Sequence, residues 1–203
     1  ALKILDKAKQ TALELDEKSI ASEIIDLEKV IESQFITRSI EGRADELIRQ
    51  STEISKQNHY ATELSNLSLK LYSEMLTKGY VKNDEDRAEI MKIFNAQIQK
   101  INFEKLNFTE KLWYFKAHVW KNQLLQEYKY TLKYAFQWVD LFHKNPEMIV
   151  SHPVWYIKGN TYLLKILFLY GNIDILEESF KDFNEVVHSS SFAQNENLQR
   201  SEE

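Results

Sequence analysis

Apolar residues recur every three or four positions along almost the whole chain, a spacing that places them on one face of an α-helix. The N-terminal segment shows this clearly, because Leu5, Ala8, Ala12 and Leu15 share a common helical face. The same periodicity predicts further helices in the first half of the chain, over residues 20–31, 37–56, 58–78 and 84–98.

Residues at the borders of these segments support the helix limits. Asn58 and Asp84 are expected to be N-caps, since their short side chains accept hydrogen bonds from free backbone N–H groups. Gly79 follows directly after Lys78, which is the usual place for a glycine that ends a helix. Gly42 falls inside the third expected helix, where we expect it to allow close packing; a break in the helix at this point is the alternative.

The second half predicts four more helices, over residues 109–124, 128–142, 153–170 and 173–187. Thr109 is the expected cap of the first of them. Pro153 stands where a proline is tolerated, in the first turn of a helix. Residues 102–107 form the least regular interior stretch and are a candidate boundary between two packing units. The chain has only four Gly and two Pro, which favours few, long elements.

A short sequence repeats in this second half. Leu112–Ala117 reads Leu-Trp-Tyr-Phe-Lys-Ala, and Val154–Gly159, about forty residues later, reads Val-Trp-Tyr-Ile-Lys-Gly. Each copy opens a helix that is followed by a second helix, and repetition at this period is typical of stacked helical hairpins. We expect Trp113 and Trp155 to be buried anchors, and Ala117 and Gly159 to lie where two helices approach closely. An irregular helical bundle is the alternative.

The repeated helix pairs resemble the tetratricopeptide repeat. In the last pair, Trp155, Gly159 and Tyr162 have the spacing of that family, with Phe180 in the second helix. The preceding pair contributes its own set, namely Trp113, Ala117, Trp120, Ala135 and Pro146. Both pairs are several residues longer than the family's repeat, and the first hundred residues match it only in helix patterning. The chain looks like the divergent repeats of this type found in larger bacterial proteins of unknown role.

The resemblance implies an all-α fold: a right-handed α-solenoid of about nine helices, built from stacked antiparallel hairpins. We expect one domain over residues 1–188, with sub-units 1–101 and 108–188. Residues 189–203 are expected to form a polar, weakly ordered tail, because Ser189 begins a run poor in apolar residues.

Composition narrows the classes of partner. The net charge of −5 argues against a general nucleic-acid binder, which needs a basic surface. The longest apolar stretch, residues 162–170, is interrupted by Lys165 and is far shorter than the roughly 20 residues that span a bilayer, so no membrane segment is expected. The lack of Cys excludes disulfides and fits a reducing compartment, and we expect a cytoplasmic location. Because the chain starts at Ala1 without Met, we expect it to be a fragment of a longer protein.

No pattern predicts catalysis. The five His include no pair with the four-residue spacing of a helical zinc site, and there is no glycine-rich phosphate loop and no nucleophile elbow. Asp84, Glu85 and Asp86 resemble a calcium loop only superficially and are better interpreted as capping residues. We therefore expect no enzyme, no cofactor and no metal, although an enzyme built in a helical bundle stays open.

A binding function is better supported. If Trp113 and Trp155 point into the core, their neighbours in sequence turn toward the groove that such repeats form. The expected partner-binding residues are Tyr114, His118, Lys121, Asn122, Tyr156 and Asn160. In peptide-binding members of the family, Lys and Asn at such positions hold a carboxylate. The first hypothesis is a non-catalytic scaffold that binds a peptide, a partner domain or a second copy of itself. The alternative is a sensor or regulatory segment of a larger signalling or transcription protein.

Overall fold

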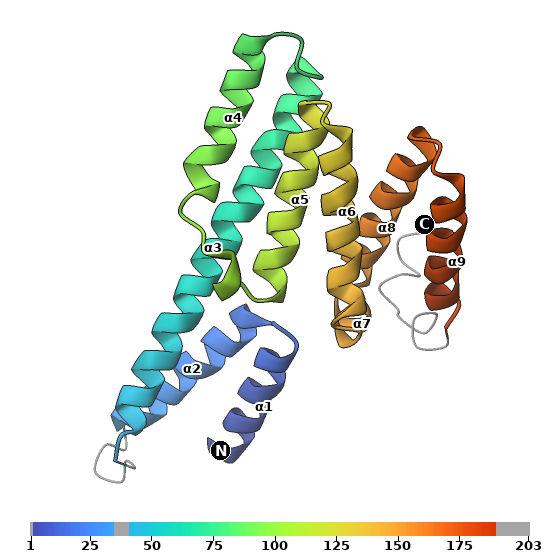
Figure 1. Cartoon of the computed structure of the whole chain (residues 1–203). Coiled ribbons are helices and arrows are strands. Elements are labelled where there is room, and N and C mark those ends of the chain that lie inside the picture. The colour runs from blue at the N-terminus through green and yellow to red at the C-terminus, as the bar shows by residue number, and fades with distance from the viewer. Residues whose placement is uncertain (1, 35–40, 190–203) are drawn as a thin grey trace. The chain divides into compact units, whose positions relative to one another are not determined.

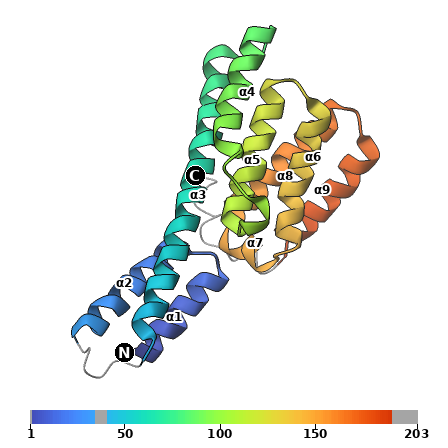
Figure 2. The same cartoon turned by 60° about the vertical axis from the view of Figure 1, so that its left-hand side comes forward.

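The computed structural model describes residues 2–34 and 41–189, and every regular element among them is helical (Figures 1 and 2). The helices, in chain order, are α1 (Leu2–Glu14), α2 (Lys18–Gln34), α3 (Arg43–Lys78), α4 (Asp84–Ile98), the short 3-10 helix η2 (Phe103–Lys105), α5 (Phe108–Leu124), α6 (Tyr128–His143), α7 (Glu147–Ser151), α8 (Pro153–Leu169) and α9 (Ile173–Val187). The all-α class is thus confirmed for the described part of the chain, with nine α-helices. The right-handed stacking of hairpins stays a prediction. Of the expected tail, residues 190–203 lie outside the described residues, as do residues 37–40 of the third expected helix.

Helix α3 differs most from expectation. Two helices divided at Asn58 were predicted, but a single helix of 36 residues runs through that position. No Gly or Pro interrupts it, and Asn inside a helix costs less than 1 kcal/mol relative to Ala. The hydroxyl of Thr62 donates to the carbonyl of Asn58, so the polar residues here are accommodated within the helix. The buried apolar residues of α3 are Leu47, Ile54, Leu64, Leu67 and Leu71.

The turns explain where the helices end. Gly42 has φ of +80°, a left-handed conformation, and lies in the turn before α3, so its expected place inside a helix is wrong and the break is correct. Gly79 has φ of +75° and follows the end of α3, as predicted. The N-cap of α4 is Asn83, whose side chain accepts from the N–H of Asp86; Asp84 is the first helical residue. Thr109 is likewise inside α5 and not its cap, since the helix already begins at Phe108.

The chain divides into two compact units. Unit 1 comprises Ala1–Glu63 and Ile101–Glu110, and unit 2 comprises Leu64–Lys100 and Lys111–Glu203. This division differs from the expected sub-units 1–101 and 108–188, because α3 and α5 each contribute residues to both units. A boundary inside two continuous helices leaves no composition change in the sequence from which it could be predicted.

Unit 1 combines a small apolar core with buried ion pairs. Its core consists of Ala12, Ala21, Ile25, Leu47 and Ile54. The carboxylate of Glu28 is fully buried and pairs with Lys9 at 2.5 Å and with Arg43 at 3.1 Å. Lys18, also buried, pairs with Glu110 at 2.7 Å. Removing one partner of a buried ion pair is strongly destabilising, because it leaves the other charge buried without compensation. The helices of this unit are therefore held in place by specific ion pairs as well as by apolar contacts.

Unit 2 contains the larger aromatic core. Trp138 on α6 is fully buried, and α8 packs against both α6 and α9. A Cβ atom built on Gly159 would lie 2.8 Å from Nε1 of Trp138, so the predicted close approach at Gly159 is confirmed. Ala117 is also fully buried. Gly159 lets α8 pack closely against α6, and Ala117 lies in the apolar core of the same unit with Leu67, Leu71 and Phe94.

Candidate ligand-binding pocket

Most of the residues expected to bind a partner are buried. Tyr156 is 0% exposed, Asn160 2%, Asn122 0% and His118 7%, so the predicted exposed surface through these residues is not present. The Tyr156 ring packs against Phe142 and Phe183 in the core instead of facing a groove.

The remaining expected residues gather at a second place. The rings of Tyr114 and His118 lie 4.5 Å apart, and His118 stacks on Tyr134 at 4.0 Å. Burial, with added repulsion from Lys121, lowers the pKa of His118 to about 3, so this ring is neutral at neutral pH. Lys121 lies 3.7 Å from the carboxylate of Glu127. These side chains form packing contacts among α4, α5 and α6.

Tyr156 and Asn160 belong to neither that cluster nor a shared groove. The amide of Asn160 donates to the carbonyl of Tyr156 at 3.0 Å, within α8. Asn160 also lines a separate cavity of about 310 Å³ together with residues of α6 and α9. The sequence prediction therefore joined two places that the structure keeps apart.

The physical reason is that the assigned phase of α8 was wrong. Trp155 was expected in the core and Tyr156 at the groove, whereas Tyr156 is buried and Trp155 is half-buried. Adjacent helical residues point about 100° apart, so an error of one residue turns the inferred core face outward. Helix α8 is apolar on nearly every side, which leaves a weak amphipathic signal.

The two repeated tryptophans meet at the pocket side of α5 and α8. The rings of Trp113 and Trp155 lie 4.9 Å apart with an edge-to-face angle of 68°. The ammonium of Lys116 lies 4.4 Å from the centre of each ring, and that of Lys158 lies 4.9 Å from the ring of Trp155. Since each lysine follows its tryptophan by three residues, the repeated sequence places a cation and an aromatic ring together in both copies.

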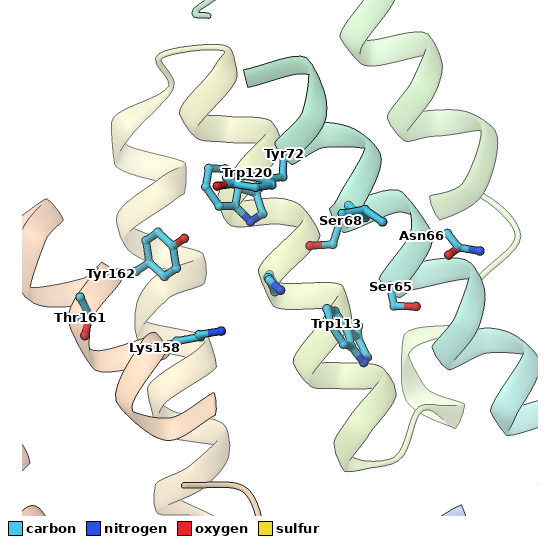
Figure 3. A pocket seen from close by; sticks show the side chains of 11 residues that line it. Ser65, Asn66, Ser68, Tyr72, Trp113, Trp120, Lys158, Thr161 and Tyr162 are labelled. Carbon is cyan, nitrogen blue, oxygen red and sulfur yellow. The ribbon is translucent and has the colours of Figure 1, made fainter. Parts of the chain in front are cut away.

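Beside this group is a cavity of about 640 Å³. Three helices of unit 2 line it: α3 through Ser65, Asn66, Ser68, Leu69 and Tyr72, α5 through Trp113, Lys116 and Trp120, and α8 through Lys158, Thr161 and Tyr162. Figure 3 shows Lys158 directed from α8 toward α5, with the indole rings of Trp113 and Trp120 on α5.

The aromatic wall is held by its own ring contacts. Trp120 lies 4.9 Å from Tyr72 and 5.5 Å from Tyr162, and Tyr162 lies 5.8 Å from the buried Trp138. Rings that support one another in this way keep a cavity open without a ligand, so little ordering is needed on binding.

The polar groups of the cavity are cationic or hydrogen-bonding. Burial, followed by repulsion from Lys158, lowers the pKa of Lys116 to about 8. Neither lysine has a carboxylate partner among the described residues. Ser68 is 1% exposed, and its hydroxyl oxygen has no hydrogen-bond partner in the described part of the chain. The cavity thus offers two unpaired cations and one unpaired hydroxyl beside apolar rings, a set suited to an anionic ligand with an apolar body.

Sequence reasoning named none of the cavity's lining residues as a binding residue. The signal that could have located it is the repeated Trp-x-x-Lys spacing. Elsewhere, within residues 2–34 and 41–189, no three His, Asp or Glu side chains are grouped closely enough to hold a metal ion. Over the same ranges, each helix is too short or too polar to cross a bilayer.

Comparison of the chain with protein-family models, with curated proteins and with solved structures gives no match, so the resemblance to the tetratricopeptide repeat stays a prediction.

Proposed function

We propose that this chain is a non-catalytic binding domain that receives a peptide, or a segment of a partner protein, in the cavity lined by α3, α5 and α8. The observation that carries the proposal is the cavity itself, whose volume of about 640 Å³ lies within the usual range of ligand sites. Its aromatic and amphipathic lining is of the kind that dominates binding energies.

Binding is favoured over catalysis by the kinds of group in the lining. The lining residues provide ammonium groups, hydroxyls, an amide and aromatic rings, but neither a carboxylate nor an imidazole to act as partner acid or base. Such groups hold and orient a ligand.

The proposal includes the repeat architecture as its structural basis. In a stack of hairpins α3/α4, α5/α6 and α8/α9, the first helix of each pair would line a common groove. The lining of the cavity supports this, because all of its residues belong to the first helices α3, α5 and α8.

A second candidate is a sensor or regulatory segment that responds to a small molecule. The specific observation in its favour is again the volume, since about 640 Å³ accommodates a compact metabolite as well as a few peptide residues. In that case occupancy of the cavity would be passed to other parts of a longer protein.

Selection of peptides from a random display library tests the proposal. The affinity of enriched peptides is measured by fluorescence anisotropy for wild type and for two variants. Thr161→Trp fills the cavity from an exposed position of α8, and Lys129→Trp is an exposed control on α6. We expect wild type and the control to bind equally, and Thr161→Trp to lose about tenfold or more in affinity. Failure to enrich any peptide, or equal binding by Thr161→Trp, would rule out a peptide site in this cavity. If small organic molecules raise the melting temperature of wild type but not of Thr161→Trp, the sensor function replaces it.

A further inference from the structure

Three enclosed lysines outside the cavity pair with glutamate side chains, whereas the two lysines at the cavity have no carboxylate partner among the described residues. Lys9 and Lys18, which are buried, and Lys121, which is half-buried, each contact a Glu side chain. Lys116 and Lys158 contact tryptophan rings instead. Lys116 is half-buried and Lys158 is exposed, and their two positive charges repel one another in a protein whose net charge is −5. An anion placed between them would relieve this repulsion.

Ser68 adds an independent observation on the opposite wall. It is almost fully buried on α3, lines the cavity and leaves its hydroxyl without a partner. A buried hydroxyl without a hydrogen bond is costly, so native structures usually provide it with a partner from protein, water or ligand. In Figure 3 its oxygen is on the α5 side of α3. A ligand oxygen in the cavity would satisfy it.

The apolar residues of the lining indicate the chemistry of the uncharged part of the ligand. The rings of Tyr72, Trp113, Trp120 and Tyr162 form most of the apolar wall, and flat rings of this kind pack well against aromatic or branched aliphatic groups.

The lining favours a carboxylate over a phosphate. Residues 65–72, 113–120 and 158–162 all lie within helices, where backbone N–H groups are already bonded to carbonyls. No helix N-terminus and no arginine lines the cavity, and these are the groups that most often complete a phosphate site.

We propose that the cavity binds an organic carboxylate, with the charged group at Lys116 and Lys158 and an aromatic or branched apolar body against Trp113, Trp120 and Tyr162. This inference rests on the proposed binding function and specifies its ligand. A free small acid and the C-terminus of a peptide have this same chemistry.

Matched acids and amides test the charge requirement by isothermal titration calorimetry on the whole chain. The probes are naphthylacetate and naphthylacetamide for the free acid, and acetyl-Gly-Gly-Phe with a free or an amidated C-terminus for the peptide. We expect at least one acid to bind about tenfold or more tightly than its amide, with acetate much weaker than naphthylacetate. The pair with the larger preference identifies the source. Equal binding of acid and amide in both pairs, or no binding of any probe, would overturn the proposal.

Charge-removing variants locate the interaction. Lys116→Met and Lys158→Met keep an apolar stem and should each reduce the preference for acid over amide about fivefold or more, whereas Lys165→Met, an exposed control on α8, should leave it unchanged. An unchanged preference in both cavity variants would refute the assignment to these lysines. If library-selected peptides still lose affinity in Thr161→Trp while acid and amide bind equally, the proposed peptide site stands and only the carboxylate inference fails.

Discussion

Replacement of Gly159 by Ala tests the closest helix contact of unit 2. The added Cβ would lie 2.8 Å from Nε1 and 2.9 Å from Cδ1 of Trp138, well inside ordinary van der Waals contact. Trp138 is fully buried and its ring is rigid, so it cannot turn aside as the end of a flexible side chain could. Helices α6 and α8 must therefore separate by several tenths of an ångström, at the cost of neighbouring contacts.

Two opposing effects set the magnitude. Overpacking of a well-packed core costs about 1–3 kcal/mol. Ala is better than Gly inside a helix by about 1 kcal/mol, which offsets part of that cost. We expect Gly159→Ala to lower the free energy of unfolding by about 1 kcal/mol, although helix propensity alone predicts an increase of the same size.

Urea unfolding followed by tryptophan fluorescence provides the measurement, because all four tryptophans lie in unit 2. Trp138→Val removes Cδ1, Nε1 and Cε2, the ring atoms that the new Cβ would meet. In that background Gly159→Ala should change sign and become stabilising by about 1 kcal/mol, and a double-mutant cycle isolates this coupling. A stabilising effect in the wild-type background, or the same effect in both backgrounds, would refute the contact.

Three further predictions concern charge. Burial in the folded protein lowers the pKa of Lys116 to about 8, below the ordinary lysine value of 10.5. Between these pH values the unfolded chain binds more protons, so stability should rise with pH. Over the same range Lys116 loses its charge, so the affinity for naphthylacetate should fall as the pH passes about 8. In Lys116→Met the affinity should not change with pH over this range. The other titratable groups that line this cavity are Lys158, Tyr72 and Tyr162. In unit 1, Glu28→Ala leaves Lys9 and Arg43 without their buried partner and should cost about 3 kcal/mol, measured by urea unfolding with circular dichroism. A loss below about 1 kcal/mol, comparable with the exposed control Glu53→Ala, would show that other groups compensate these cations.

The sequence was sufficient to locate most of the helices. Apolar periodicity located α1, α2, α4, α5, α6, α8 and α9, and Gly79 marked a true helix end through its left-handed backbone. The prediction of a helix start failed at Asn58, because a good capping residue is also tolerated inside a continuous helix. A capping residue is favoured because it accepts hydrogen bonds from free N–H groups, and this preference does not show whether the preceding helix has ended.

The buried ion pairs of unit 1 could not be predicted from the sequence. Lys9 and Glu28 are separated by 19 residues, and Lys18 and Glu110 by 92, so no local spacing links them. A lysine or glutamate on a helix is normally solvated, and only the packing of the helices decides which of them become enclosed together.

The faces of α5 and α8 were ambiguous for a different reason, and the ambiguity was resolvable. Aromatic residues occupy several sides of both helices, so apolar character alone does not select the core face. A lysine does identify the solvent-facing side, because lysine is almost never fully buried without a partner. A residue three positions before the lysine lies on the same side of the helix. Lys116 and Lys158 therefore indicate that Trp113 and Trp155 lie at the accessible side, as the structure has them. The same reasoning places Trp138 in the core, because Ala135 and Phe142, its neighbours on that side of α6, are apolar and fully buried. The repeated Trp-x-x-Lys spacing is thus better interpreted as a sign of a binding face than of a packing core, and the carboxylate experiment tests that interpretation directly.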